Sequence, residues 1–532
     1  MLEWLKKSGP DPEDPMRNPA SASALLAGLR AADPVKALDE LRGWLASLGE
    51  KTDFDERTRS EVLSLVQDAG AAHVSTLLAQ YLANSSPDKP VVREAKWNAM
   101  LAYATGLVDA QCTSAERMLS SAGADPAASG ATAAAMVRGL RACRLLAKVC
   151  LIHYADVPPS LWKRAYGVHA RAEAAGCAGT AVRPHRSQRT TTTANEELAR
   201  LLMLHVIAPE TLASEQIEIA DRVADQLGGE FTLRPRGLAD SPFWFDCEGD
   251  RAPQRATTGP GADAARFFGP GAGLEALARL RRQMSSAGGS PTDVLGKDIP
   301  MHAQVAAVEH LLRHWGPDAP PAAPAHSPAE GDLLVVHGFA RVCKQLTDGA
   351  GAARGLALVS DDDVNLEPPE AWVIRDAGGG ELGAETRQPG ASWARSGMLV
   401  GFSLAGRNEW WLGRIRRTHA DPNRSPHIDI ALLSKKPVAL SLRPRAGSAE
   451  GEADWDVAAG TFAFVEVHAI LLPEASEATG TPNILLPPEG WKAGRVYEAT
   501  LDKTQRSLRL VRVLQRGEDF VRAAYEWLPA AA

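Results

Sequence analysis

The chain is short of the features that mark secreted, membrane and disulfide-bonded proteins. Its six cysteines form no CxxC pair and are too few for a disulfide scaffold in 532 residues. No stretch approaches about 18 uninterrupted apolar residues, and the polar N-terminus lacks the apolar core of a secretory signal. These absences predict a cytoplasmic protein with reduced thiols and no membrane insertion.

Signatures of catalysis are missing as well. The chain contains no GxxxxGKS/T phosphate-binding loop, no HExxH or GxSxG motif, and no zinc-type grouping of Cys and His. The acidic run Asp361–Asp363 lacks the ligand spacing of a calcium loop and is interpreted as a solvated turn. Asp246, Cys247 and Glu248 are neighbours, but nothing there pairs a nucleophile with a base. We therefore expect no enzymatic activity, no metal and no cofactor.

The composition is that of a globular protein without a general affinity for nucleic acid. Hydrophobic residues make up 45% and charged residues 23% of the chain, as is usual for globular proteins, and the length predicts about three or four domains. The net charge is −7, whereas proteins that coat DNA are generally basic. We expect no DNA or RNA partner.

The first half of the chain is predicted to be helical. Residues 1–19 are polar and contain several prolines, as in a flexible tail. Over residues 20–228 apolar side chains recur at helical spacing, for example along the stripe from Met136 to Cys150. Such amphipathic helices must cover their apolar faces, which predicts a helical bundle or a short solenoid. A repeat array would need a second copy at a period of about 34 residues. The sequence shows no such copy, so the bundle is favoured.

Start and stop signals mark several of these helices. Asp33 followed by Pro34 predicts an N-cap and a first helical residue. Ser160 is expected to cap another helix. A further helix is expected over residues 214–227, ending at Gly228.

Residues 229–315 are predicted to form a mixed region that connects the two halves. The aromatic run Phe243–Phe245 is either a platform for a ligand or, as we favour, part of a strand or loop that fills a domain interface. Helices are expected again over about 273–286 and 299–315. Proline and alanine dominate residues 316–331, which indicates a linker.

After this linker the pattern changes to short apolar strands separated by turns, as in a β-barrel or sandwich. We interpret residues 332–446 and 459–532 as two small β units, or as one barrel with a large appendage, around an acidic loop at 448–456. The fold class is therefore α+β multidomain, with a helical bundle or short solenoid before a C-terminal β-barrel and an additional β unit. Strands are expected over residues 333–336, 356–359, 372–374, 398–402, 409–415, 428–433 and 438–442, and then over 462–472, 484–486, 496–501, 508–514 and 520–527.

One group of residues in the first β unit is suited to an anionic ligand. A strand ends at Asp376 and leads into a glycine-rich hairpin at Gly378. The next strand but one carries three arginines, Arg414, Arg416 and Arg417. Arg414 and Arg416 are expected on one face because side chains alternate along a strand. Guanidinium groups grip phosphates and stack on bases, and Asp376 can accept hydrogen bonds from a guanine edge. The alternative is an ordinary outward sheet face beside a tight hairpin.

The region around these residues resembles a PilZ domain, a six-stranded barrel family that binds cyclic-di-GMP. The likeness lies in the segments WVIRDAGGGELG, GMLVGF, WWLGRIRR and HIDIALL, which follow the strand order of that family. It covers residues 332–446, a minority of the chain, and implies a barrel with a cyclic dinucleotide as its ligand. The rest of the chain resembles large proteobacterial proteins in which a helical front half accompanies a PilZ domain.

The ligand motifs of the PilZ family are only partly present. In the DxSxxG turn Asp376 matches, whereas Gly378 replaces the serine and Glu381 replaces the last glycine. The family's RxxxR motif precedes its first strand, and the corresponding stretch here, HGFARVCKQLTDG, carries Arg341 followed by Lys344. A lysine does not reproduce the planar bidentate fork of an arginine. Glu381 also adds negative charge beside an anionic ligand.

These residues support two functions. In the first, the chain is a non-enzymatic regulatory protein whose degenerate PilZ-like domain binds cyclic-di-GMP and acts through a protein partner. Its ligand contacts would be Asp376, Gly378, Arg341, Arg414, Arg416 and Arg417. In the second, the barrel no longer binds nucleotide and the chain is an oligomeric scaffold. A protein partner or a homo-oligomer is expected in both.

Overall fold

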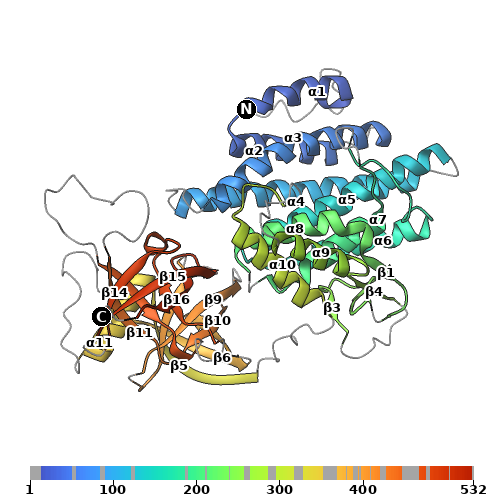
Figure 1. Cartoon of the computed structure of the whole chain (residues 1–532). Coiled ribbons are helices and arrows are strands. Elements are labelled where there is room, and N and C mark those ends of the chain that lie inside the picture. Colours follow the sequence, from blue (N-terminus) through green and yellow to red (C-terminus); the bar gives the residue numbers. More distant parts are fainter. Residues whose placement is uncertain are drawn as a thin grey trace. The chain divides into compact units, whose positions relative to one another are not determined.

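A computed structural model of the chain divides into two compact units, residues 1–320 and 321–532 (Figure 1). It describes residues 14–529 apart from 51–54, 84–89, 122–125, 186–189, 210–211, 239, 257–263, 286–294, 317–326, 352–367, 379, 387–392, 395–396, 408, 420–426, 446–465, 475–479 and 502–503. Several predictions fall outside the described residues: most of the N-terminal tail, the strand at 356–359, the run Asp361–Asp363 and the acidic loop at 448–456.

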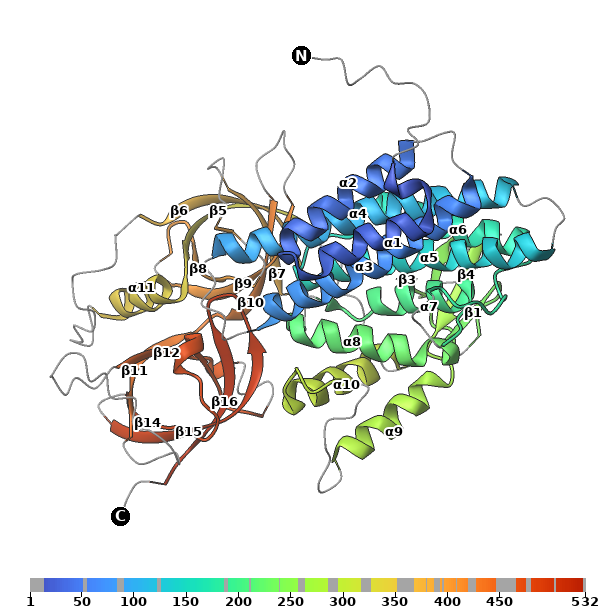
Figure 2. The same cartoon turned by 90° about the horizontal axis from the view of Figure 1, so that it is seen from above.

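Helices occupy the region that was predicted to be helical, and Figure 2 shows them from above. The predicted helix over residues 214–227 is confirmed. The helices of this region are α1 (Pro19–Gly28), α2 (Pro34–Glu50), α3 (Glu56–Leu82), α4 (Pro90–Ser121), α5 (Pro126–Ile152), α6 (Pro159–Ala174), α7 (Ala194–His205) and α8 (Ser214–Leu227).

The sequence signals where several of these helices begin. Helices α1, α2, α4, α5 and α6 all start with proline. Proline is suited to this position because the N–H of the first helical residue makes no hydrogen bond within the helix. The carboxylate of Asp33 accepts a hydrogen bond from the backbone N–H of Lys36 at 3.1 Å, as predicted for the start of α2. The predicted cap at Ser160 is wrong, because α6 begins at Pro159 with Pro158 at the N-cap.

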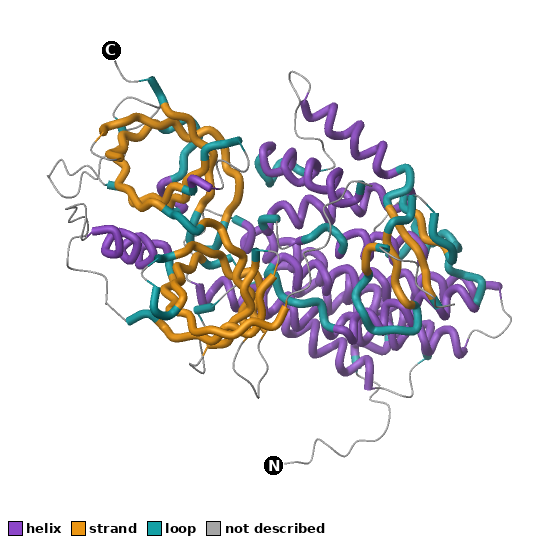
Figure 3. The backbone as a smooth tube through the Cα atoms, turned by 90° about the horizontal axis from the view of Figure 1, so that it is seen from below, coloured by secondary structure: helices purple, strands orange, loops and turns teal. Residues whose placement is uncertain are grey.

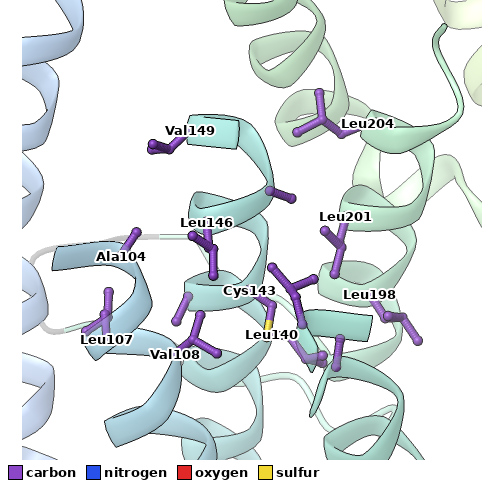
Figure 4. Close-up of a cluster of buried hydrophobic side chains, with 14 of the residues drawn as sticks. Ala104, Leu107, Val108, Leu140, Cys143, Leu146, Val149, Leu198, Leu201 and Leu204 are labelled. Carbon is purple, nitrogen blue, oxygen red and sulfur yellow. The ribbon is translucent and has the colours of Figure 1, made fainter. Parts of the chain in front are cut away.

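Helix α5 is buried between α4 and α7, and its predicted apolar stripe is confirmed. The stripe residues between Met136 and Cys150 are at most 3% exposed. Figure 4 shows the apolar side chains of the three helices meeting in one cluster; those labelled are Ala104, Leu107, Val108, Leu140, Cys143, Leu146, Val149, Leu198, Leu201 and Leu204. Burying a side chain of this kind contributes roughly 1.5–3 kcal/mol.

Charged residues fix how α5 meets α8. The guanidinium of Arg144 lies 2.7 Å from the carboxylate of Asp221, and Lys148 Nζ lies 2.6 Å from Glu218 Oε2. These groups are largely buried, so removing one partner would leave a charge without compensation. The ion pairs therefore select one register of α5 against α8.

Helix α3 is the described helix that is long and apolar enough, by length and composition, to cross a membrane. In the structure Val62, Leu63 and Val66 are at most 1% exposed, within the core that α3 shares with α1, α2 and α4. Arg59 on the same helix is also buried and donates a hydrogen bond to the carbonyl of Leu48. We interpret α3 as a core helix of the bundle.

The mixed region belongs to the same unit as the helices. Strands β1 (Thr232–Arg234), β2 (Phe243–Asp246), β3 (Gln254–Arg255) and β4 (Ala265–Gly269) form an antiparallel sheet in the order β1-β4-β2-β3, followed by α9 (Gly273–Ser285) and α10 (Met301–Trp315). Phe243 stacks on Phe268, and Phe245 stacks on Tyr166 of α6. Both phenylalanines are 2% exposed and belong to the core of the first unit. The expected strand is confirmed, but its rings fill the interior of one unit and not a domain interface.

The second unit contains two closed six-stranded barrels, which Figure 3 shows as two rings of strands. The α+β multidomain fold class is therefore confirmed. The first barrel has the order β10-β7-β6-β5-β8-β9, from β5 (Ser327–His337), β6 (Glu370–Gly378), β7 (Glu381–Thr386), β8 (Leu399–Leu404), β9 (Trp411–His419) and β10 (His427–Ser434). The second has the order β11-β12-β13-β16-β15-β14, from β11 (Val438–Pro444), β12 (Val467–Leu471), β13 (Asn483–Leu486), β14 (Val496–Leu501), β15 (Thr504–Arg516) and β16 (Val521–Trp527).

The strands differ from the expected ones at several places. Strand β7 was not predicted, and β5 begins at Ser327, inside the stretch expected to be a linker. Strand β11, which was expected in the first β unit, pairs with β12 and β14 and so belongs to the second barrel. Residues 435–437 alone separate β10 from β11.

Most of the segment HGFARVCKQLTDG belongs to a helix, α11 (Phe339–Gly351), which follows the first strand of the barrel. It therefore does not precede the first strand, as the RxxxR segment does in the PilZ family. Phe339, Val342 and Cys343 are buried and share one helix face, which explains why the segment is helical. Gly338 has a φ of +83°, a conformation that favours glycine, and turns the chain from β5 into α11.

Two valines on α4 test the helical core. Val108 is 3% exposed and Val92 is 43% exposed. Val108→Ala should lower the free energy of unfolding of the first unit by roughly 1.5–3 kcal/mol, because two buried methyl groups and their packing are lost. Val92→Ala makes the same chemical change on the same helix and should have an effect within about 0.5 kcal/mol. Denaturant unfolding measures both, and equal losses would contradict the burial described here.

Candidate ligand site on the tandem barrels

The predicted hairpin lies between β6 and β7. Gly378 pairs with Glu381, and Gly380 in the turn has a φ of +83°, which favours glycine. Asp376 pairs with Gly383 on β7, and a Cβ at that glycine would overlap the carboxylate of Asp376. The chain therefore keeps Asp376 flat against the strand instead of projecting it from the hairpin.

Asp376 lies beside a histidine of β10, the strand on the far side of β7. Its Oδ2 is 3.5 Å from Nε2 of His427, and the same nitrogen is 3.2 Å from Oδ1 of Asp429. Two carboxylates thus flank one imidazole on this face of the first barrel. The carboxylate of Asp376 is therefore close to a side chain of its own barrel.

Arg416 forms an ion pair with Glu381 of the hairpin. Their side chains are 13% and 15% exposed, so the pair is mostly out of solvent. Strand β9 contains a bulge here, because Asp429 pairs with Arg417 and the next residue of β10 pairs with Ile415. The bulge places Arg416 outside the regular alternation, which is why the simple two-residue rule does not put it on one face with Arg414.

The other predicted contacts are dispersed. Arg417 pairs with Asp429 through the backbone, and its side chain lies outside the described part of the structure. Arg341 is on α11 and donates a hydrogen bond to Nε2 of His337 at 3.1 Å. That imidazole stacks on Trp393 at 3.7 Å between ring centroids. The structure therefore brings Arg416 to the hairpin and leaves Arg341 in a separate cluster.

The two barrels share an apolar junction built from α11 and the outer faces of β8, β9, β12 and β13. Its buried members are Val336, Phe339, Val342, Cys343, Leu399, Leu412, Ile470, Leu472, Leu485 and Phe520. Residues from both barrels occur in this one cluster, so the barrels pack directly on each other.

Asp519, between β15 and β16, bridges this junction. Its Oδ2 accepts a hydrogen bond from the N–H of Phe339 at 2.8 Å, and its Oδ1 accepts one from the N–H of Leu399 at 2.9 Å. Phe339 is the first residue of α11, so the second barrel supplies the carboxylate at that helix terminus. Burial raises the pKa of Asp519 to about 6, although the two N–H donors act to lower it.

Arg414 lies on the outer face of the first barrel that meets the second. It is 6% exposed and pairs with Leu399, a member of the junction core. Arg522 on β16 pairs with Leu485, another member of that core. Residues directly opposite on neighbouring strands share a face, so both arginines face the junction.

Arg522 is the residue that sequence reasoning missed. Its Nε is buried without a hydrogen-bond partner. Burial, and then the positive charge of Arg414, lower the pKa of Arg522. No local motif could have shown that Arg522 faces the junction, because its position depends on how the two barrels pack.

Arrangements of catalytic type were sought in the first unit. Ser64 Oγ and Asp68 Oδ1 lie 3.3 Å and 3.1 Å from the same nitrogen, Nδ1 of His185, whereas a relay needs both ring nitrogens. Burial lowers the pKa of His185 to about 3, and burial raises the pKa of Cys247 beside Asp246. Among the described residues no group of three His, Cys, Asp or Glu side chains could hold a metal ion.

The helical domain is similar to part of a known receptor. Residues 20–236 match the family described as "Cyclic-di-GMP receptor FimW, N-terminal domain". The match spans α1 to α8 and β1 and ends before the barrels. No curated protein and no solved structure matches the chain. The likeness of the first barrel to a PilZ domain stays a prediction.

The ion pair between Arg416 and Glu381 should contribute to the stability of the second unit. Glu381→Gln removes a charge-assisted hydrogen bond from a mostly buried arginine and should cost roughly 1–3 kcal/mol in urea unfolding. The matched control is Glu385→Gln. Glu385 is on the same strand as Glu381, and its ion pair with Arg375 is exposed, so this substitution should change stability little. Equal losses of stability in the two variants would contradict the larger contribution expected of the Arg416 pair.

Asp519 should make the stability of the second unit depend on pH. In the folded chain the carboxyl group of Asp519 has a pKa of about 6, against about 3.9 for an ordinary aspartate. Its contribution is therefore fully present below about pH 4 and is lost as the pH rises through 6, by at most about 3 kcal/mol. Urea unfolding at pH 4.5 and 7.5 measures the difference, which should be smaller in Asp519→Asn. An unchanged difference in that variant would contradict this assignment.

Proposed function

We propose that the protein is a non-enzymatic receptor for cyclic-di-GMP that acts in the cytoplasm through a protein partner. The observation that carries the proposal is the match of residues 20–236 to the N-terminal domain of a cyclic-di-GMP receptor. The PilZ-like segments of the first barrel point independently to the same ligand. Two parts of the chain with different sequence patterns thus suggest one molecule.

The two units suit different tasks in such a receptor. The first unit is a helical bundle with a small sheet, whose interior is filled by apolar side chains and ion pairs. The barrels carry the arginines and the aspartate expected to contact a cyclic dinucleotide. We propose that the barrels bind the ligand and that the helical unit contacts the protein partner, with ligand binding shifting the population of partner-competent states.

An oligomeric scaffold is the second candidate. It is favoured by the ion pair between Arg416 and Glu381, which already neutralises one of the expected phosphate contacts. The separation of Arg341 from the hairpin points the same way. In this alternative the barrels serve as packing surfaces, and the chain functions through assembly.

Titration of the full-length chain with cyclic-di-GMP separates the two candidates. A receptor should bind with a Kd of about 1 µM or below, which corresponds to about −8 kcal/mol, by calorimetry. Cyclic-di-AMP is the matched control, because it has the same phosphate ring but lacks the guanine edge that Asp376 is expected to recognise. Absence of binding at high micromolar ligand, together with a stable oligomer in light scattering, would replace the receptor by the scaffold.

A further inference from the structure

We infer that His337 is a proton-sensitive switch at the start of helix α11. In its neutral form the imidazole holds Arg341 of α11, and in its protonated form it releases Arg341 and binds Glu370 of β6 instead. The inference concerns how α11 is attached to the first barrel and does not depend on the proposed ligand.

His337 occupies a position from which it can act on α11. It is the last residue of β5, and Gly338 alone separates it from the first residue of the helix. Its side chain is 19% exposed, so protons from solvent reach it. Its ring lies flat on that of Trp393, with 3.7 Å between the ring centroids and 11° between the planes. This stacking sets the plane of the imidazole and thereby the direction in which Nε2 points.

Nε2 of His337 faces two groups of opposite charge. Nη1 of Arg341 lies 3.1 Å from Nε2, and Oε1 of Glu370 lies 3.7 Å from the same nitrogen. A guanidinium only donates hydrogen bonds, so Nε2 is the acceptor and the imidazole is neutral with its proton on Nδ1. When Nε2 takes up a proton, it loses its lone pair, repels the guanidinium and attracts the carboxylate. One proton thus moves the hydrogen bond of His337 from α11 to β6.

Glu370 is held in place for this exchange by Trp372. Its Oε2 accepts a hydrogen bond from Nε1 of Trp372 at 3.0 Å, and Trp372 is fully buried. The other oxygen, Oε1, is the one that lies toward His337. The side chain of Glu370 is 12% exposed, and a charge-assisted hydrogen bond to an imidazolium is stronger there than in water.

The remaining charges near His337 come from α11 and from the second barrel. Lys344 lies three residues after Arg341 and adds positive charge to the same helix. Asp519 is held by two backbone N–H groups of the junction, and β8 places the uncharged Val400 opposite His337. The positive charge of α11 therefore opposes protonation of the imidazole, whereas the two carboxylates favour it. Histidine ordinarily titrates near pH 6.5, so the exchange of partners falls in the physiological range.

The first turn of α11 has a directed contact to each barrel. The N–H of Phe339 is bound by Asp519 of the second barrel, and Arg341 is bound by His337 of the first. Protonation of His337 removes the contact to the first barrel and leaves the contact to the second. Acidification therefore loosens α11 from the barrel that precedes it in the chain.

The first measurement follows the protonation of His337 in the full-length chain without ligand. Isotope-labelled histidine reports the state of each ring nitrogen by NMR, and the signal missing from His337→Gln identifies His337. At pH 8 its Nε2 should be unprotonated and its Nδ1 protonated. The midpoint of the titration should move to higher pH in Arg341→Gln and to lower pH in Glu370→Gln, by at least about 0.5 pH unit each. Arg375→Gln removes an exposed arginine from the same strand as Glu370 and, as the matched control, should leave the midpoint within about 0.2 pH unit.

The second measurement follows the helix. Hydrogen exchange over α11, corrected for the pH dependence of the intrinsic rate, should be roughly two- to tenfold faster at pH 5.5 than at pH 7.5 in wild type and in Arg375→Gln, as expected for the loss of one hydrogen bond. His337→Gln keeps an acceptor for Arg341 but does not titrate, so its exchange should be the same at both pH values. Arg341→Gln lacks the hydrogen bond at both pH values and should exchange fast at both. Circular dichroism confirms that each variant is folded.

Three results would overturn the switch. A protonated Nε2 at pH 8, or a midpoint that moves in neither Arg341→Gln nor Glu370→Gln, would show that the two groups do not compete for this nitrogen. A pH dependence of α11 exchange that persists in His337→Gln would assign the effect to Asp519, whose pKa of about 6 lies in the same range. Equal exchange at pH 5.5 and 7.5 in wild type would show that protonation of His337 leaves α11 in place.

Discussion

Closing a six-stranded sheet on itself leaves no unpaired strand edge, so two such barrels can join only through side chains, turns and added helices. The second unit follows this constraint throughout. Helix α11 and the outer faces of β8, β9, β12 and β13 supply the apolar contact, and the turn at Asp519 supplies the directional hydrogen bonds. A protein partner of either barrel must likewise be recognised through its surface.

The elements of the fold could be predicted well where they depend on local pattern. Pro34 and the stripe from Met136 to Cys150 predicted helices correctly, because helix capping and apolar periodicity depend only on residues that are close together in the sequence. Local pattern could not predict to which of the two barrels β11 belongs. That strand pairs with β12 and β14, and only closure of the second sheet decides its neighbours. Helix α11 was not predicted, because its buried face is formed by only a few residues between two strands.

The candidate site was less predictable for a related reason. Asp376 and Arg416 lie on β6 and β9, which are not neighbours in the barrel. A bulge in β9 and the proximity of His427 and Glu381 decide what each side chain contacts. Arg522 could not be found by a motif search, since it faces the junction only when both barrels are folded and packed. Sequence reasoning thus found the residue types that suit an anion, and strand pairing and packing decide what each of them contacts.

The short connector of residues 435–437 between β10 and β11 gives this junction a particular thermodynamic character. Two barrels on a long flexible tether would lose much freedom each time their faces met. Here the connector keeps the faces at a high effective concentration, so the junction forms as an intramolecular contact with a small entropic penalty. The apolar cluster and the two hydrogen bonds of Asp519 are then sufficient to hold the barrels in one arrangement.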